Sequence, residues 1–395
     1  MSKSNKTTPN VPTLRFADYT DEWHKYALSD FVTRITRRNK NNESSLPLTI
    51  SAQYGLVDQI TFFNKTVASV DLSGYYLLYN GDFAYNKSYS NDYAWGAVKR
   101  LDKYEKGCLS SLYFVFRPTD KVDSDYLTHY FETNKWHKGI SDIAGEGARN
   151  HGLLNMAVDD YFATKHYLPS LSEQKKIACF LNLITKRIEI QNKIISDLKV
   201  LKKELCNKVF GKGSAVRLGD FIEEVTTRNK SNSCENVLSV SNKMGFIKQS
   251  EQFEDRTVAS ENKSNYKVVT EGCFAYNPAR INVGSIALLS TYKIGIISPM
   301  YVCFKTKSNL NLEYLNFYYQ SGFFYKELQK KLEGSVRQCL TYENMSEILI
   351  PYVGIEEQKA IAVTLNKFAT LIATEEKYIK SLQKQKSYFL NAMFI

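Results

Sequence analysis

The chain lacks several features that would place it in whole classes of protein. No stretch of its 395 residues approaches the roughly 20 consecutive apolar residues of a membrane-spanning helix. The polar N-terminal residues 1–10 contain no apolar core like that of a signal peptide. Hydrophobic residues make up 43% of the chain, which is too many for a disordered protein. We therefore do not expect a membrane, secreted, fibrous or disordered protein.

Grouped metal ligands and paired cysteines are missing as well. The seven cysteines stand singly, without any Cys-x-x-Cys pair, and their odd number does not suit a closed set of disulfides. The five histidines are equally scattered along the chain. We expect buried free thiols in a reducing cytoplasm, and no metal site.

Catalytic motifs cannot be found in the sequence. Residues 211–214 (Gly-Lys-Gly-Ser) lack the residue that must follow the lysine of a phosphate-binding loop, so we expect them to end a helix. Residues 276–279 (Tyr-Asn-Pro-Ala) lack the second proline and the aromatic residue of the amino-methyltransferase motif. No Ser–His–Asp or Cys–His arrangement recurs in both halves. We therefore do not expect this chain to be an enzyme.

An internal repeat determines the organisation of the chain. Three segments of the first half recur in order in the second half, about 184 to 191 residues later, and such ordered matches indicate a tandem duplication. The segments are Leu-Ser-Asp-Phe at 28–31 and Leu-Gly-Asp-Phe at 218–221, Gly-Asp-Phe-Ala-Tyr-Asn at 81–86 and Gly-Cys-Phe-Ala-Tyr-Asn at 272–277, and Glu-Gln-Lys-Lys-Ile-Ala at 173–178 and Glu-Gln-Lys-Ala-Ile-Ala at 357–362.

Each half ends in a segment with the apolar spacing of a coiled coil. Its apolar residues follow alternating steps of four and three over about five heptads, which predicts a long helix with a seam for a partner helix. Polar residues fill the gaps in each seam, Gln191 and Lys202 in one copy and Glu375 and Lys386 in the other. We predict antiparallel pairing with Gln191 near Glu375; the alternative is that each helix lies on its own domain. The seam residues are Ile177, Leu181, Ile184, Ile188, Ile195 and Leu198 in the first half, and Ile361, Leu365, Phe368, Ile372, Ile379 and Leu382 in the second.

The first part of each half is rich in Tyr, Phe, Val and Asn, and its short alternating runs predict mostly strands with a few helices. Residues 126–136 and 314–324 are each predicted to form one helix. The expected fold is therefore α+β, with two similar globular domains separated by two long antiparallel coiled-coil helices. We predict the first globular domain at residues 1–170 and the first helix at 171–210. The second globular domain and helix should occupy residues 211–352 and 353–395.

Clusters of arginine, lysine and amide side chains recur in both globular domains. Arginine and the amides of Asn and Gln match the base edges of guanine and adenine in the major groove, and lysines can hold phosphates. We predict DNA contacts from these clusters; the alternative is that they are solvated loops. The first cluster follows the first apolar stretch and contains Arg34, Arg37, Arg38 and Lys40 in the first half, and Arg228, Asn229 and Lys230 in the second. The second follows the Phe-Ala-Tyr-Asn strand and contains Asn86 and Lys87 in the first half, and Asn277, Arg280 and Asn282 in the second. The third lies in late glycine-bounded loops and contains Arg149, Asn150 and His151 in the first half, and Arg337 and Gln338 in the second.

The net charge is distributed unevenly along the chain. The total is +11, yet residues 171–210 carry nine basic and four acidic side chains, and residues 355–395 carry six and four. The predicted helices thus hold +7 of the +11, and the globular domains are nearly balanced. Net charge is therefore a weak argument for DNA binding by those domains, which must depend on the local clusters.

The sequence resembles a known family at its repeated tail motif. Both halves close on Pro-x(3–5)-Glu-Gln-x-x-Ile-Ala followed by a heptad helix, which resembles the specificity (S) subunit of type I restriction–modification systems. Residues 11–16 and 22–23 look like the lead-in common in Gram-positive members. The resemblance covers essentially the whole chain.

The resemblance implies a division of labour among several subunits. Each globular half would be a target-recognition domain reading one part of a bipartite double-stranded DNA target. The helices would form a spacer and dock two DNA-adenine methylation subunits, with motor–nuclease restriction subunits joining the complex. S-adenosylmethionine, ATP and Mg would be bound by those partners, this chain binding no cofactor, and the location would be the bacterial cytoplasm. Alternatives are a specificity subunit whose single partner chain both cuts and methylates, an enzyme with an unfamiliar active site, and a coiled-coil oligomerisation module.

Overall fold

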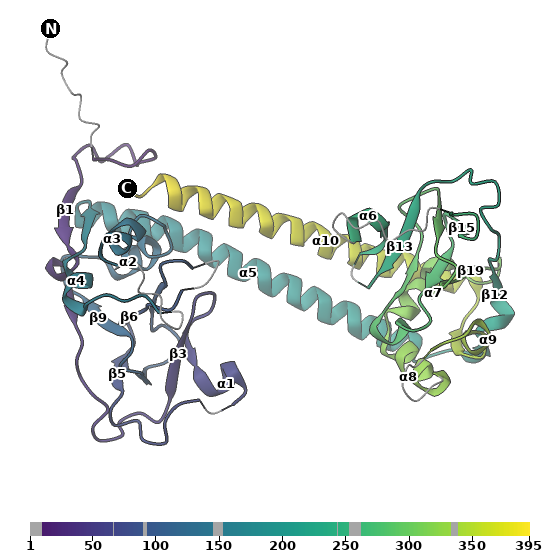
Figure 1. The fold of residues 1–395 in the computed structure, drawn as a ribbon, viewed down its shortest axis with the longest axis horizontal. Coiled ribbons are helices and arrows are strands. Elements are labelled where there is room, and N and C mark those ends of the chain that lie inside the picture. Colours follow the sequence, from purple (N-terminus) through teal and green to yellow (C-terminus); the bar gives the residue numbers. More distant parts are fainter. Residues whose placement is uncertain are drawn as a thin grey trace, which may run out of the picture. The chain divides into compact units, whose positions relative to one another are not determined.

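The computed structural model describes residues 10–65, 67–89, 93–144, 153–242, 244–252, 262–332 and 339–395. The chain divides into two compact units, Met1–Gln191 with Tyr378–Ile395, and Asn192–Lys377. Each unit combines a globular part with stretches of two long helices, α5 (Leu171–Phe210) and α10 (Ile355–Ala392) (Figure 1). The predicted α+β fold, with a long helix between two sheet-rich domains, is confirmed.

The two globular parts share one strand order, as the repeat requires. The first unit has the sheet β2 (Val32–Arg34), β9 (Phe114–Pro118), β6 (Phe83–Asn86), β7 (Ala97–Arg100), and the sheet β4 (Gly55–Asp58), β3 (Pro47–Ser51), β8 (Lys106–Leu109), β5 (Tyr76–Tyr79). The second unit has β12 (Ile222–Glu224), β19 (Val302–Thr306), β16 (Phe274–Tyr276), β17 (Ile286–Leu288), and β14 (Gly245–Lys248), β13 (Val237–Ser241), β18 (Ile294–Ile297), β15 (Lys267–Thr270). A separate antiparallel pair completes each unit, β1 (His24–Ala27) with β10 (Lys165–Leu168), and β11 (Ser214–Arg217) with β20 (Leu349–Tyr352).

Short helices cover one face of each domain, and the repeated Phe-Ala-Tyr strand shows why. Successive side chains of a strand point to opposite faces of the sheet. Phe83 and Tyr85 on β6 therefore pack against the helices, whereas Ala84 packs against the second sheet. These helices are α2 (Ser124–Tyr130), α3 (His137–Ile143) and α4 (Val158–Ala163) in the first unit, and α7 (Leu312–Tyr319), α8 (Gly322–Lys331) and α9 (Tyr342–Ser346) in the second. Two shorter helices contact the other sheet instead, α1 (Gln59–Phe63) at β3 and β4, and α6 (Gln249–Gln252) at β13 and β14.

The prediction of one helix at 126–136 and one at 314–324 is wrong, because the helix ends early in the first region and the second region spans two helices. α2 ends at Tyr130 and α3 begins at His137; α7 ends at Tyr319 and α8 begins at Gly322. In the second unit the side chain of Ser321 accepts a hydrogen bond from the backbone N–H of Phe324, which caps a new helix start.

The repeated Glu-Gln motif joins each long helix to its domain through the glutamine. Gln174 is 2% exposed; its Oε1 accepts from the backbone N–H of Asp123 at 2.8 Å, and its Nε2 donates to Pro169 O at 3.0 Å. Gln358 is fully buried and makes the equivalent bonds, accepting from Asn311 N–H and donating to the carbonyl of Val353, both at 2.8 Å. Asp123 and Asn311 are themselves the N-cap residues of α2 and α7. Each glutamine thus connects the start of a long helix to the start of a domain helix.

The N-terminal segment contacts both long helices of the first unit. Arg15 forms a two-bonded ion pair with Glu173, whose side chain is 1% exposed, with both N–O distances at 2.7 Å. Leu14 N–H donates to Ala392 O at 2.9 Å and satisfies a carbonyl at the end of α10. Glu173 is therefore a buried ion-pair partner, whereas its repeat equivalent Glu357 is exposed.

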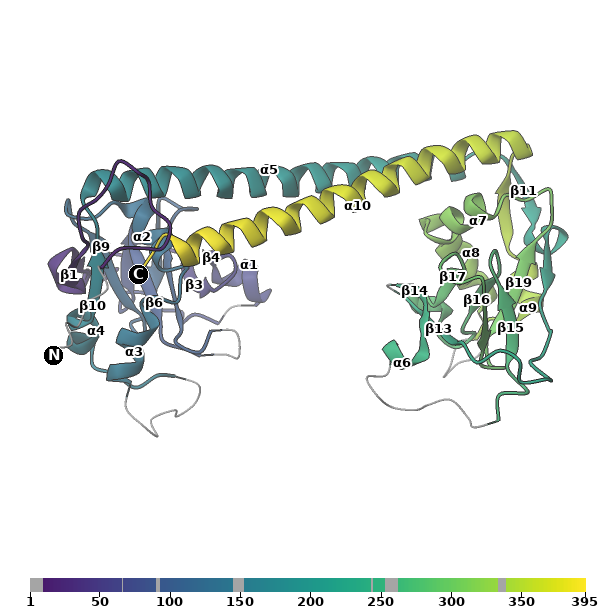
Figure 2. The same cartoon turned by 90° about the horizontal axis from the view of Figure 1, so that it is seen from above.

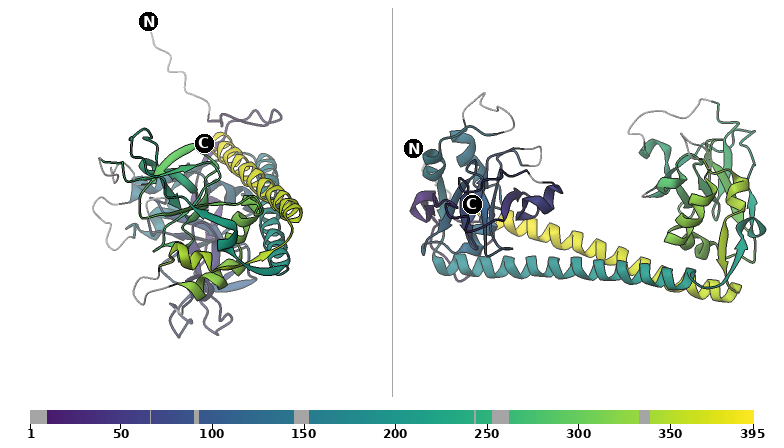
Figure 3. Two further views of the ribbon diagram at one scale, coloured as in Figure 1. Left: turned by 90° about the vertical axis from the view of Figure 1, so that its right-hand side faces the viewer. Right: turned by 90° about the horizontal axis from the view of Figure 1, so that it is seen from below.

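Within each unit the two long helices run antiparallel. In the first unit the rings of Phe180 and Phe389 meet edge to face at 4.9 Å, and further along α5 Arg187 donates to the hydroxyl of Tyr378. Figures 2 and 3 show the long helices running beside the globular part of each unit. The pairing of Gln191 with Glu375 stays a prediction. Among the seam residues, Ile177, Leu181, Ile195, Leu365, Ile372, Ile379 and Leu382 are buried, and Ile184, Ile188, Leu198, Ile361 and Phe368 are half-buried.

Candidate nucleic-acid interface

The first basic cluster lies after β2 and β12 at equivalent places in the two units. Arg38 donates to Gly74 O and Arg228 donates to Asn265 O, both at 2.6 Å. The Arg38 guanidinium also lies 4.2 Å from the centroid of the Tyr76 ring. Each arginine thus holds its own loop through one nitrogen of its guanidinium group.

The prediction of a DNA contact for Asn229 conflicts with its surroundings. The side chain is 2% exposed, its Nδ2 donates to Cys234 O at 3.0 Å, and its Oδ1 accepts from Cys234 N–H at 3.2 Å. Asn39 at the equivalent position is fully buried and makes the same two bonds to Ser44. Because an amide engaged at both ends inside a loop cannot also bind a base edge, we assign Asn229 to closing that loop.

Arg37 is also engaged inside the domain. It forms an ion pair with the fully buried Asp82 and donates to Leu77 O at 2.8 Å. Asp82 receives a second arginine, Arg117, at 2.6 Å, and the backbone N–H of Tyr79 at 2.8 Å. Arg37 thus helps to neutralise a buried carboxylate, although its side chain remains 35% exposed.

The second cluster follows β6 and β16. The side-chain oxygens of Asn86 and Asn277 accept from the backbone N–H two residues later, at 2.9 and 3.1 Å, and close a turn in each unit. Lys87 Nζ lies 5.2 Å from the ring centroid of Phe114. Arg280 and Asn282 are exposed on the turn after β16.

The exposed members of these clusters form the candidate interface. Lys40 and Lys230 occupy equivalent positions and are both exposed, and Arg34 is 43% exposed, with Asp159 at 3.9 Å. Arg280 and Asn282 complete this set in the second unit. The late-loop residues Arg149, Asn150, His151, Arg337 and Gln338 lie outside the described residues.

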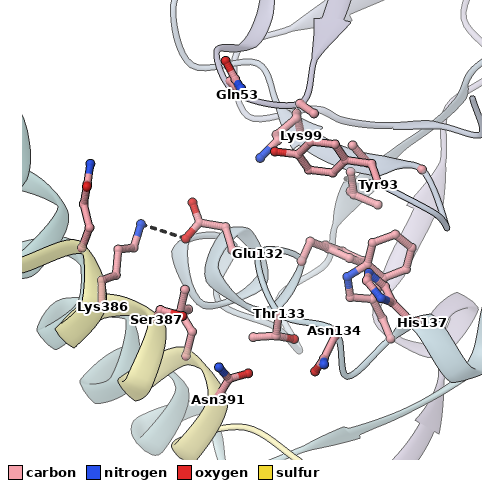
Figure 4. Close-up of a pocket in the computed structure, with 18 of the residues that line it drawn as sticks. Gln53, Tyr93, Lys99, Glu132, Thr133, Asn134, His137, Lys386, Ser387 and Asn391 are labelled. Atoms are coloured by element: carbon pink, nitrogen blue, oxygen red, sulfur yellow. Dashed lines mark ion pairs between the residues drawn. The ribbon is translucent and has the colours of Figure 1, made fainter. Parts of the chain in front are cut away.

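Two lysines in the seam gaps reach the globular domains. Lys386 on α10 forms an ion pair with Glu132 at 2.8 Å beside a groove of about 630 Å³ (Figure 4). Lys202 on α5 occupies the same place in the other copy and lies 5.1 Å from the ring centroid of Phe317. A lysine at the same seam gap in both copies was the sequence signal for these contacts, and sequence reasoning missed them.

A polar network around the buried His129 continues from Glu132 into the first domain. His129, which is 3% exposed, contacts the Oδ1 of Asn182 on α5 at 2.8 Å, and Asn182 donates to Asp125 at 2.8 Å. Burial raises the pKa of Glu132, but the hydrogen bond from His129 and the charge of Lys386 outweigh it and lower the pKa to about 2. The network therefore connects the domain to both long helices through charged and amide groups.

The long helices leave apolar side chains exposed beside the seam. On α5, Leu183 and Ile190 are 65% and 52% exposed, and Ile194 and Leu201 are 41% and 51% exposed. Leu183 and Ile190 belong to the first unit and Ile194 and Leu201 to the second, and the spacing of seven residues within each pair keeps its two side chains along one stripe of the helix. On α10, Leu371 and Tyr388 are exposed as well. Exposed apolar stripes of this kind are typical of surfaces that bind another protein.

The described part of the chain contains no group of three or more His, Cys, Asp or Glu side chains placed to hold a metal ion. Within the same residues, no helix is long and apolar enough to cross a membrane. The cysteines are free, and Cys108, Cys206, Cys273 and Cys303 are buried.

Comparisons with known proteins agree on one family. Residues 214–384 match the model of the type I restriction modification DNA specificity domain. The chain is 25% identical over 327 residues to the type I restriction enzyme MjaVIII specificity subunit of Methanocaldococcus jannaschii, which covers 73% of this chain and 74% of that protein.

Solved structures are similar over nearly the whole chain. The S subunit of a type I restriction–modification system from M. genitalium has a TM-score of 0.57 at 14% identity, covering 98% of this chain and 99% of that one. A chain from a study of complex assembly and conformational transition of the type I R-M system has a TM-score of 0.54 at 16% identity, covering 93% and 96%. At these identities the likeness supports the fold.

Proposed function

We propose that this chain is a specificity subunit of a type I restriction–modification system and selects a bipartite DNA target for partner subunits that carry out the chemistry. The observation that carries the proposal is the duplicated unit, in which a domain of one strand order is fixed to a long helix by the same buried glutamine. Two equivalent domains suit two separate segments of a duplex. Each domain would read one part of the target.

The exposed basic side chains support DNA recognition within each unit. Lys40 and Lys230 would contact phosphates, which fix the position of a protein on DNA without specifying a sequence. Arg280 has the planar guanidinium group that binds guanine through two hydrogen bonds. It lies on the turn after β16, so it would contribute to the half-site read by the second unit.

The exposed stripe on α5 supports a docking role for the long helices. A partner helix packed along Leu183 and Ile190 in the first unit, or along Ile194 and Leu201 in the second, would cover apolar surface that the described chain leaves in water. We propose that DNA-adenine methylation subunits dock here, and that motor–nuclease subunits join them. The chain itself would be non-catalytic, and S-adenosylmethionine, ATP and Mg would be bound by those partners.

Mapping methylated adenines on a random-sequence DNA library tests the division between the units. The assembled complex is prepared with the wild-type chain, with Arg280→Ala, and with Lys293→Ala, an exposed lysine of the same unit outside the candidate interface, as control. Arg280→Ala should relax one position of one half-site by about 1–3 kcal/mol and leave the other half-site unchanged. Target choice that changes in both half-sites, or in neither, would contradict the assignment.

A further inference from the structure

Each unit carries a pocket where the end of a long helix meets the separate β pair. The first, of about 540 Å³, is lined by β1, β10, α3 and Ile395, the residue that ends the chain after α10. The second, of about 650 Å³, is lined by β11, β20, α8 and Gly211, which directly follows α5. Tyr130 lines the first pocket and its repeat equivalent Tyr318 lines the second. The two pockets therefore occupy one place in the repeated fold.

Both pockets have a rim with an excess of lysine. Lys138 and Lys326 occupy the same repeat position, eight residues after Tyr130 and Tyr318, and both are exposed. The remaining lysines come from different positions in the two units, yet each rim has two more basic than acidic side chains. The first rim has Lys25, Lys135, Lys138 and Lys165 against Asp142 and Asp160, and the second has Lys212, Lys326 and Lys330 against Glu327.

The floors of the pockets are held by hydrogen bonds and differ in chemistry. In the first, the buried His166 bonds to the hydroxyl of Tyr130 and to Thr164, both at 2.8 Å. In the second, Ile350 takes the place of His166, and the hydroxyl of Tyr318 donates to Leu349 O at 2.9 Å. What the two pockets share is therefore their position, their aromatic lining and the positive rim.

We infer that each pocket receives an acidic segment of a partner subunit, so that two copies of one partner bind to equivalent places. This inference rests on the proposed function, which requires a partner present in two copies. A concave pocket with aromatic walls suits side chains of a peptide better than the convex backbone of a duplex. The carboxylates in each rim can accept hydrogen bonds from the backbone N–H groups of a peptide, whereas the phosphates of a duplex offer no donor.

Charge reversal in each pocket tests the inference on the full chain. One variant carries Lys135→Glu, Lys138→Glu and Lys165→Glu, a second carries Lys212→Glu, Lys326→Glu and Lys330→Glu, and a third combines all six. The probe is the methylation subunit of the same restriction–modification system, and native mass spectrometry over a concentration series measures both binding steps. Lysine-to-arginine versions of both sets and Lys121→Glu, an exposed lysine outside the pockets, are the controls.

Each triple variant should weaken one binding step by about tenfold or more and leave the other unchanged, so that a one-to-one complex accumulates. The six-fold variant should weaken both steps, and the controls should bind like wild type. Unchanged binding of two subunits by the six-fold variant would overturn the inference. So would weaker binding of a random duplex by the chain alone with normal subunit binding, because the occupant would then be a phosphate backbone. A wild-type chain that binds no methylation subunit would instead contradict the proposed function.

Discussion

The glutamine that joins each long helix to its domain offers the most direct test of the fold. We predict that Gln358→Met destabilises the second unit, because methionine has a similar length but no amide. The substitution removes the acceptor for Asn311 N–H and the donors to Val353 O and Asn309 O, at 2.8, 2.8 and 3.3 Å, from a fully buried site. The apolar packing of the side chain is largely retained.

The expected loss in the free energy of unfolding follows from the backbone groups that are left without a hydrogen-bond partner. A buried polar group without its partner costs about 1–3 kcal/mol, and the Asn311 N–H and the Val353 carbonyl both lose a short hydrogen bond. Partial relaxation of the loop makes the sum smaller than two full penalties, so we expect about 3 kcal/mol. For a unit of this size that corresponds to a fall in melting temperature of about 6–12 °C.

The assay combines thermal unfolding with amide hydrogen exchange of the α7 region. The matched control is Lys359→Met, which places the same residue one position later on an exposed site whose ion pair with Glu356 is worth little. In Gln358→Met, exchange at Asn311 and the first turn of α7 should accelerate; in the control it should not. Equal melting temperatures for the two variants and unchanged exchange at Asn311 would refute the clamping role of the amide.

Three further predictions concern ion-paired carboxylates in the first unit. Arg15→Ala should cost about 3–5 kcal/mol by leaving Glu173 buried and unpaired, whereas Arg15→Met with Glu173→Leu should melt close to wild type. Because the pKa of Glu132 is lowered to about 2, its contribution to stability is present above its ordinary pKa and is lost as pH falls from about 5 towards 2. Glu132→Gln should therefore reduce the acid-dependent loss of stability in denaturant titrations, and an unchanged pH profile would contradict this. Asp82→Ala should lower the free energy of unfolding by about 2–4 kcal/mol in the same titrations. This is less than the loss expected for a fully buried ion pair, because both arginines remain partly exposed to solvent.

The sequence predicted the elements whose signal is local or periodic. The repeat and the heptad seams predicted two similar domains and the long helices, since apolar spacing directly reflects which face of a helix is buried. The break between α2 and α3 was missed because the apolar pattern continues through it. The Gln174 clamp depends on a backbone N–H 51 residues away, which no local pattern encodes. Asn229 bonds to Cys234 only five residues away, but its burial, which no local pattern reports, assigns it to closing a loop and not to a DNA contact.

The two units show which parts of this fold are free to change. Directly before the Phe-Ala-Tyr strand, the first unit has the buried Asp82, which is paired with Arg37 and Arg117. The second unit has the buried Cys273 at the same position. Burial raises the pKa of the Cys273 thiol to about 11, so it is neutral at physiological pH and needs no counter-charge. Lys305, which replaces Arg117, donates to Thr270 instead.

The same strand order is thus compatible with a charged residue, Asp82, in one unit and a neutral one, Cys273, in the other. The buried glutamine at the helix junction is, in contrast, the same in both units. The junction tolerates fewer substitutions, because a single side chain there forms hydrogen bonds with backbone groups of two segments at once. A side chain on the surface, or one that closes a single turn, forms hydrogen bonds only with solvent or within its own loop. The fold therefore separates a fixed attachment of domain to helix from surfaces whose residues can vary.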